Sequence, residues 1–506
     1  MELTVKRSGM PCCENVFAYL MPAEEAVETV VPDTMPDVER ILFTEGIASI
    51  RSKEVLDGAV NITGSVNATV LYVPEGGEGT SSLEATIPLS VELDAPDVTS
   101  DSLAVALLTV VSMDSRLLNP RKILVRAVVN VFVLAFNRTE LGISSGLEGE
   151  GADSVETLSE TSSLSPVVCV REKTFVVSDE YTLQPGLLPI GELLWHSTQI
   201  IPGNVRSVGA RIIFNGTVRL NIIYSAAGSG ELSTATFESE FSQMLDAETD
   251  LTSPDCDVYS MLTAEYVEPV TLAGGERGIS AEYHIVSQCV CTDSVRVECL
   301  TDCYSNTHLL DVGRTQTELN AAQRRSTVRA SASETLPASP APVNIVRVMC
   351  RAGSAESENG VLRCPVAVTA LYTASDGQVY AASRRLTCEA PAELAEGEQV
   401  LCVRVLGTEC SSGITQGGID VRVQADFEVV SARRCQFSQI SSVGDMGAVE
   451  SEELPSVTVI RAGEGDTLWT LGKRYHSTAG LIRDLNSLDE GANISGRVLL
   501  IPRAGK

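Results

Sequence analysis

The sequence lacks the segments by which proteins enter or cross a membrane. No stretch approaches the ~20 consecutive apolar residues that a membrane-spanning helix needs. The first residues, MELTVKRSGMPCCENVF, contain no apolar core of a secretory signal peptide. We therefore expect no membrane insertion and a cytoplasmic protein.

Residues that perform catalysis are also scarce. Among 506 residues there are only four histidines, His196, His284, His308 and His476. None stands in a Cys/His, Ser/His/Asp or HExxH pattern, and the chain has neither a P-loop nor a dinucleotide-binding fingerprint. We therefore expect no enzyme, no catalytic residue and no cofactor.

Positive charge is sparse and unevenly placed. The formal net charge is −30, yet residues 457–506 carry seven Lys/Arg against five Asp/Glu, which leaves 30 against 62 for the rest. Binding to nucleic acid or anionic lipid depends largely on Lys and Arg. A body this acidic argues against nucleic acid as a partner.

The fourteen cysteines are too few for a disulfide scaffold in a chain of this length, and we expect most of them to be reduced. Cys289, Cys291, Cys299 and Cys303, near His284, raise the possibility of a zinc site. Cys289 and Cys291 lie on one face of a predicted strand, where side chains two residues apart are ~7 Å from each other. That separation is too wide for one tetrahedral ion, so we predict buried structural cysteines and no metal.

Self-comparison shows three related stretches. They read GSVNATVLY at 64–72, GTVRLNIIY at 216–224 and CPVAVTALY at 364–372. In each, every second residue is apolar, which is the pattern of a half-buried strand. A second alternating strand follows each of them, and a proline precedes each tyrosine at a similar distance: Pro36, Pro189 and Pro337.

These coincident landmarks predict three copies of one β-rich domain, antiparallel and of sandwich or barrel type. Two stretches rich in glycine and acidic residues read as flexible linkers. The predicted order is domain 1 at 1–140, an acidic linker at 141–165, domain 2 at 166–320, domain 3 at 321–440, a linker at 441–456 and a small βααβ domain at 457–506.

The last segment carries one of the two tryptophans. Asp466 is the expected N-cap of a first helix whose Leu468, Leu471 and Tyr475 share one face. Ser477 or Thr478 starts a second helix, with Leu481, Ile482 and Leu485 as its apolar stripe. Short strands, VTVIRA and RVLLIP, flank the pair and complete the βααβ order.

The segment resembles a LysM module, through GDTLW at 465–469, LIRDLNSL at 481–488 and GRVLLIP at 496–502. The resemblance implies binding of N-acetylglucosamine-containing glycan, such as peptidoglycan, between the loop before the first helix and the loop after the second. A protein ligand remains an alternative. For Trp469, packing against the rest of the chain and direct ligand contact both stay open. The implied groove residues are Gly465, Asp466, Thr467, Leu468, Trp469, Asn486, Leu488, Asn493 and Ile494.

The first repeat, with VVPDTMPDVERIL at 30–42 followed by GSVNATVLYVPEGG, resembles the SPOCS domain of endospore-forming bacteria. Several such proteins carry two or three SPOCS copies and a LysM tail, the SipL-like arrangement. The resemblance implies a non-enzymatic scaffold of the spore coat and cortex at the forespore surface, with a coat morphogenetic protein as partner and self-association possible. The alternative function is a LysM-targeted cell-wall hydrolase.

Overall fold

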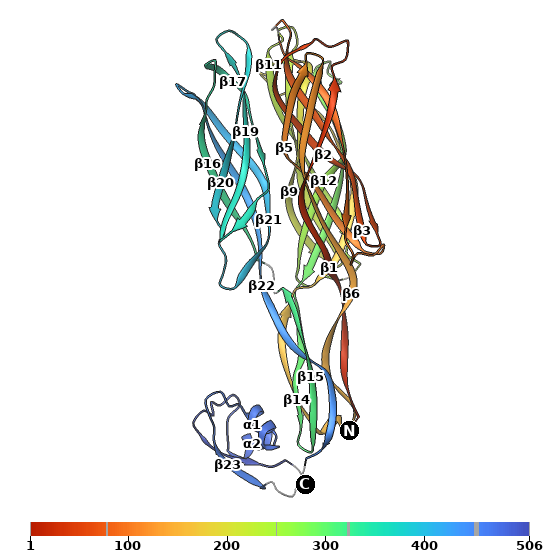
Figure 1. Cartoon of the computed structure of the whole chain (residues 1–506), viewed down its shortest axis with the longest axis vertical. Coiled ribbons are helices and arrows are strands. Elements are labelled where there is room, and N and C mark those ends of the chain that lie inside the picture. The colour runs from red at the N-terminus through yellow and green to blue at the C-terminus, as the bar shows by residue number, and fades with distance from the viewer. Residues whose placement is uncertain (1, 77–78, 249, 321–323, 450–454, 505–506) are drawn as a thin grey trace.

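The computed structural model describes residues 2–76, 79–248, 250–320, 324–449 and 455–504. Three β heads stand side by side above a narrow stalk, and the C-terminal module lies against the lower part of the stalk (Figure 1). The predicted fold class is confirmed, because the chain is mainly β and all paired strands are antiparallel, with two helices between the last two strands.

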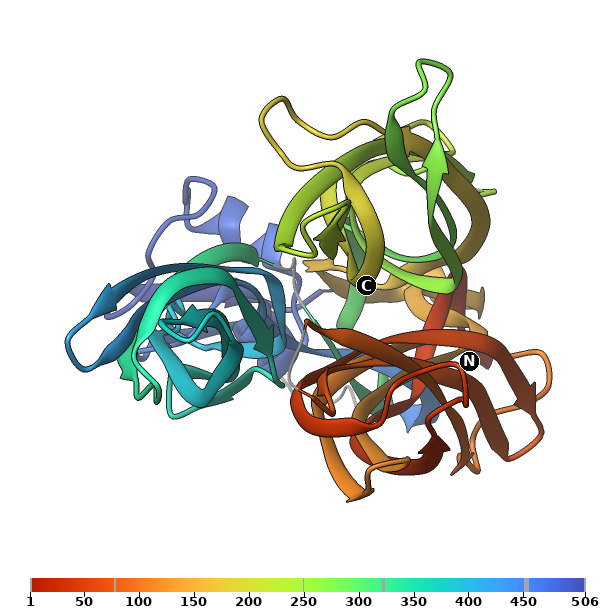
Figure 2. The same ribbon diagram turned by 90° about the horizontal axis from the view of Figure 1, so that it is seen from above.

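Each head is built from two antiparallel sheets that enclose one core, and one sheet of head 1 is joined to one sheet of head 2 through a short pairing of β1 with β8. Viewed from above, the three heads form rings around a common centre (Figure 2). The strands of head 1 are β1 (Glu2–Val30), β2 (Val38–Leu56), β3 (Ala59–Pro74), β4 (Ser81–Asp94), β5 (Leu103–Asn119) and β6 (Lys122–Glu150). Those of head 2 are β8 (Val167–Tyr181), β9 (Ile190–Val208), β10 (Arg211–Ala226), β11 (Leu232–Asp246), β12 (Pro254–Thr271) and β13 (Arg277–Asp293). Those of head 3 are β16 (Arg324–Leu336), β17 (Pro342–Ala352), β18 (Glu356–Glu358), β19 (Val361–Ala374), β20 (Val379–Pro391), β21 (Glu398–Thr415) and β22 (Gly418–Ala448).

The repeated tyrosines tie each head together at equivalent places. Tyr72, Tyr224 and Tyr372 lie two residues before the ends of β3, β10 and β19 and are almost completely buried. The Tyr72 hydroxyl donates to the carbonyl of Pro36 at 3.2 Å, and the Tyr224 hydroxyl donates to that of Leu188 at 2.8 Å. A buried hydroxyl needs a partner, and in these two heads the tyrosine finds it at or beside the proline noted in the sequence.

The residue before each tyrosine holds the heads to one another. Leu71, Ile223 and Leu371 are fully buried, although they point away from the core of their own head. They meet in one apolar cluster that takes residues from all three heads. Within it the rings of Phe43 and Trp195 pack edge to face, with centroids 5.9 Å apart. The heads therefore share a core at the centre of the assembly.

Below the heads, three two-stranded ribbons form the stalk. The ends of β1 and β6 make the first ribbon, and the end of β22 pairs with β15 in the third. The second is built from β7 (Val155–Leu164) and β14 (Val295–Ser305), and β15 spans His308–Asn320. All six strands contribute apolar side chains to two small cores, whose best-buried members include Ile143, Leu164, Cys299, Leu300 and Ile440.

The linker predictions are therefore corrected. Within 141–165, residues 141–150 belong to β6, the short turn η1 covers Ala152–Ser154, and residues 155–164 form β7. Ser144 is buried and donates from its hydroxyl to the carbonyl of Ile440 at 2.6 Å. Within 441–456, residues up to Ala448 belong to β22, while 450–454 lie outside the described residues. The first acidic segment is a paired element of the stalk because ribbon pairing satisfies its backbone.

The predicted boundary between domains 2 and 3, after residue 320, also disagrees with how the strands pair. β15, at 308–320, was placed in domain 2, yet its partner is β22 of the third repeat. Each repeat thus contributes a head and one ribbon, and each ribbon joins the segment before its head to the segment after it.

Candidate functional site

The C-terminal module has the predicted βααβ order. Strand β23 (Val457–Arg461) pairs with β24 (Val498–Pro502), and helices α1 (Leu468–Tyr475) and α2 (Ala479–Leu485) lie between them in the chain. None of the helices in the described part of the chain is both long and apolar enough to cross a membrane.

Helix α1 begins one residue later than predicted. Its N-cap is Thr467, whose side chain accepts from the backbone N–H of Thr470 at 3.1 Å, and Thr470 returns a bond to the Thr467 N–H. Asp466, the predicted cap, instead accepts from the N–H of Gly463 at 2.8 Å. The prediction was wrong because Thr and Asp are comparable caps, and the reciprocal Thr467–Thr470 pair favours the later start. For α2, Thr478 is the cap, one of the two predicted positions.

The core of the module also differs from the predicted stripe. Leu471 and Ile482 are fully buried, with Leu468 and Tyr475 packed against them, but Leu481 and Leu485 are 42% and 46% exposed. Since α2 is only two turns long, Ile482 is its one buried residue. The remaining core comes from the strands and the second loop: Ala462, Ile494, Leu499 and Ile501.

The two loops of the predicted groove are joined at their bases. The N–H of Ala462 donates to the carbonyl of Arg497, and the N–H of Gly496 returns a bond to the carbonyl of Ala462, both at 2.9 Å. Gly465 has a φ of 88° in the first loop, a left-handed conformation that suits glycine. The geometry brings the start of the first loop next to the end of the second.

The predicted groove residues divide into exposed and structural ones. Gly465, Thr467 and Asn493 are exposed, whereas Ile494 is 4% exposed and belongs to the core. Asn486 joins the end of α2 to β24, donating to the carbonyl of Leu500 at 2.6 Å and accepting from its N–H at 2.8 Å. Leu488 packs against the core.

Trp469 lies against the stalk. Its indole N–H donates to Asp302 of β14 at 2.9 Å, and its ring packs edge to face on Tyr304 with centroids 4.8 Å apart. Lys473, one turn along α1, donates to the same carboxylate at 2.6 Å. The carboxylate belongs to the second ribbon, where the pairing of β14 with β7 is interrupted by a β-bulge between Leu300 and Asp302. Of the two possibilities for Trp469, packing against the chain is the one in this structure.

Gly472 makes the close approach of α1 to the stalk possible. A Cβ at this position would lie 2.5 Å from the Tyr304 hydroxyl oxygen, which donates to the carbonyl of Ser477 at 2.9 Å. This contact was not among the predictions from the sequence. Its signal was the glycine inside a helix, which costs about 1 kcal/mol and usually has a packing reason.

We expect the Trp469→Ala variant to release the module from the stalk. The substitution removes a hydrogen bond to a charged group, worth about 1.5 to 3 kcal/mol, together with the ring contact. Hydrogen exchange should show lost protection at β14 around Asp302, and Leu481→Ala, on exposed α2 surface, is the control. Unchanged protection in Trp469→Ala would show that the tryptophan does not hold the contact.

The same contact should weaken in acid. Burial acts to raise the pKa of Asp302, but hydrogen bonds from Lys473 and Trp469 outweigh it and lower that pKa below the ordinary aspartate value. A carboxyl whose pKa is lowered in the docked form stabilises the docked form above about pH 4. This stabilisation is lost as the pH falls further. The Asp302→Asn variant should remove this pH dependence.

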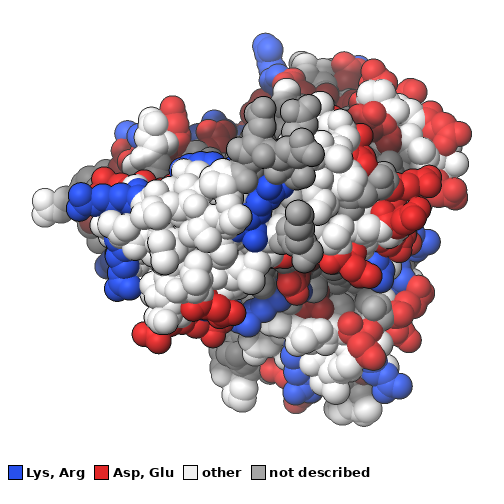
Figure 3. Space-filling model, turned by 90° about the horizontal axis from the view of Figure 1, so that it is seen from below, with Lys and Arg blue, Asp and Glu red and all other residues white. Residues whose placement is uncertain are grey.

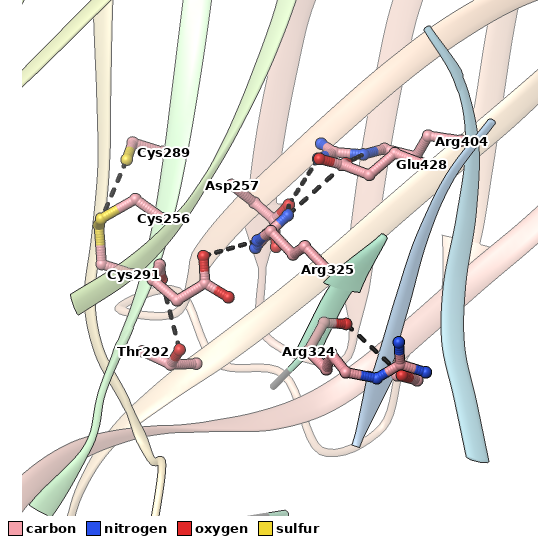
Figure 4. Close-up of polar contacts among 11 residues, drawn as sticks. Cys256, Asp257, Cys289, Cys291, Thr292, Arg324, Arg325, Arg404 and Glu428 are labelled. Atoms are coloured by element: carbon pink, nitrogen blue, oxygen red, sulfur yellow. Dashed lines mark hydrogen bonds and ion pairs between the residues drawn. A yellow bond between two sulfur atoms is a disulfide. The ribbon is translucent and has the colours of Figure 1, made fainter. Parts of the chain in front are cut away.

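The cysteine cluster of head 2 corrects one prediction. Cys256 and Cys291, directly opposite each other on β12 and β13, form a disulfide (Figure 4), while the other described cysteines are free, in agreement with the expectation that most are reduced. The Sγ atom of Cys289 is 3.5 Å from that of Cys291, closer than the ~7 Å given by ideal strand spacing, because the two side chains lean together. All three sulfur atoms lie within 4.8 Å of one another. The disulfide leaves Cys289 as the one free thiol of these three.

Two matches to known families agree with this architecture. Residues 37–118 match the family described as SipL, SPOCS domain, and residues 461–502 match the LysM domain. The chain thus carries a SPOCS domain and a C-terminal LysM domain, as the resemblance predicted. Both are binding domains without catalytic activity of their own. No curated protein and no solved structure matches the chain.

Proposed function

We propose that this protein is a non-enzymatic scaffold of the spore envelope, anchored through its LysM domain. The observation that carries the proposal is the presence of a sporulation-type SPOCS domain and a glycan-binding LysM domain on one chain. The proposed place of action is the mother-cell cytosol, at the forespore surface or in the coat.

The three heads support a scaffold role. They share the apolar cluster at their centre, and three ribbons fix them to one stalk. Three related surfaces held at constant orientation allow several weak contacts to act together, which increases avidity without a tight single site. Coat proteins or further copies of the chain are the proposed partners of these surfaces.

The largely uncharged surface of the LysM domain favours a neutral ligand. Viewed from below, uncharged residues cover much of the LysM module (Figure 3). Neutral sugars are held by backbone groups and apolar faces, which this surface provides. It also favours the second candidate ligand, a coat morphogenetic protein, because contiguous exposed apolar area often marks protein contacts. The exposed apolar side chains of the module are Val457, Val459, Leu481, Leu485, Val498 and Leu500.

Two substitutions separate the glycan from the protein ligand. Asn493→Arg places a bulky side chain in the exposed second loop and should reduce retention on purified peptidoglycan about tenfold, or about 1.4 kcal/mol. Leu485→Asp should leave that retention unchanged and instead weaken capture of the coat morphogenetic protein. Each variant serves as the control of the other, and circular dichroism checks the fold.

Failure of the wild-type protein to bind purified peptidoglycan would remove the glycan from the proposal and leave the protein ligand. Release of muropeptides by the wild-type protein, abolished by a single substitution, would favour the alternative of a LysM-targeted hydrolase and contradict the scaffold.

A further inference from the structure

A cavity of about 880 Å³ lies where the three heads converge. Most of its walls come from two strands of each head, which are β2 and β5, β9 and β12, and β17 and β21, and a few lining residues come from β1, β6 and β10. Figure 2 shows these heads around the common centre. The volume falls within the range of roughly 300 to 1,000 Å³ that is typical of small-molecule sites, which often form between domains.

The cavity is lined by four arginines in a protein with a net charge of −30. Three of them have carboxylate partners. Arg219 pairs with Glu238 at 2.7 Å, Arg351 pairs with Glu45, and Arg404 pairs with Asp257 at 2.8 Å and with Glu428. The last group continues into Arg325 between heads 2 and 3 (Figure 4). These arginines are neutralised by the protein itself.

Arg347 is the exception. Among the described residues it has no carboxylate partner, and its one hydrogen bond goes to the neutral side-chain oxygen of Asn221. Its Nε atom is buried without a partner, and so is the hydroxyl of Thr198, which lines the same cavity. Burial lowers the pKa of the Arg347 guanidinium, yet an arginine side chain stays charged in proteins.

The repeat makes this arginine unexpected. Strand pairing places Phe43 opposite Leu71, Trp195 opposite Ile223, and Arg347 opposite Leu371. The first two heads thus have an aromatic ring where the third has a cation. An apolar residue at 347 would extend the shared apolar cluster, while a buried charge without a counter-ion is costly. Beside the guanidinium the described chain supplies only the weakly acidic thiols of Cys350 and Cys410, and no carboxylate, so the position favours a negative partner from outside the chain.

We propose that the central cavity binds a small organic anion through a carboxylate or phosphate group, with Arg347 as the charged anchor. The guanidinium would donate to two oxygens of the anion from the Nη hydrogens that the bond to Asn221 leaves unused, and arginine commonly recognises such groups through paired hydrogen bonds. The Thr198 hydroxyl is a further donor in the wall, and Leu107, Val110 and Met261 provide apolar area for a carbon skeleton.

Calorimetric titration of the full chain with citrate, and separately with inorganic phosphate, tests the proposal at constant ionic strength. We expect saturable binding by the wild-type protein and at least tenfold weaker binding by Arg347→Met, which keeps the length of the side chain. The control is Arg385→Gln, which removes an exposed arginine of β20. Binding of citrate alone identifies a carboxylate ligand, and binding of phosphate alone identifies a phosphate ligand.

Thermal unfolding provides a second readout. Without ligand, Arg347→Met should melt at a higher temperature than the wild-type protein, because it removes an unpaired buried charge. The anion that binds should raise the melting temperature of the wild-type protein and not that of the variant. Arg347→Lys, which retains the charge, should keep part of the response. Absence of saturable binding for both anions, or equal binding by Arg347→Met, would overturn the proposal.

Discussion

Replacing Ile223 with alanine should cost about 2 to 5 kcal/mol and loosen the three heads from one another. The side chain is fully buried, but its contacts are with the shared cluster and not with the core of its own head. Loss of its methyl groups leaves a cavity where all three heads meet. The equivalent substitutions Leu71→Ala and Leu371→Ala should act in the same way.

Calorimetric unfolding measures this effect. The wild-type heads should unfold together, whereas Ile223→Ala should lower the transition and separate it into steps. Val208→Ala is a matched control, because Val208 lies on the neighbouring strand β9 and is 63% exposed. An equal effect of the control, or a single unshifted transition in Ile223→Ala, would show that the cluster does not couple the heads.

Ile482→Ala should have the largest effect on the LysM domain. Ile482 is fully buried in a core of six well-buried residues, and truncation there costs about 2 to 5 kcal/mol, enough to unfold so small a module. Hydrogen exchange across residues 457–502 of the full chain should detect local loss of protection while the heads remain protected.

Leu485→Ala supplies the comparison on the same helix. Its side chain is nearly half exposed, so its truncation should change stability by about 0.5 kcal/mol or less. Equal destabilisation by the two substitutions would mean that α2 packs with a different face toward the strands.

Local patterns in the sequence were sufficient for the repeats and for the type of fold. Alternation of apolar residues identified the strands that carry Tyr72, Tyr224 and Tyr372, because each has one face toward a core. The LysM domain was recognised because its order of strands and helices is compact and local. Such features depend on residues that are near one another in the sequence.

The stalk could not be predicted in this way. Residues 155–164 are polar, with a composition typical of a linker, and become a strand only by pairing with β14, more than a hundred residues later. The docking of Trp469 has the same origin, since Asp302 and Tyr304 lie far away in the chain. Composition reports the average environment of a segment and contains no information about a distant partner.

In the LysM domain, one feature could be read from the local sequence and another could not. The N-cap choice between Asp466 and Thr467 depended on a single reciprocal hydrogen-bond pair, which the sequence also contains in Thr470. The exposed Leu481 and Leu485 could not be told from core residues, because a helix of two turns gives too few residues for its apolar face to be identified.

The ribbons also determine the order in which the chain can be completed during synthesis. Each head closes on strands of its own repeat, but in the stalk the backbone of Ser144 bonds Gln439, and Arg7 bonds the carbonyl of Ser441. Contacts across such separations form late, because loop closure must come first. A chain released before β22 would have heads 1 and 2 folded but head 3 and the stalk incomplete, and its unpaired strand edges would mark the chain as incomplete.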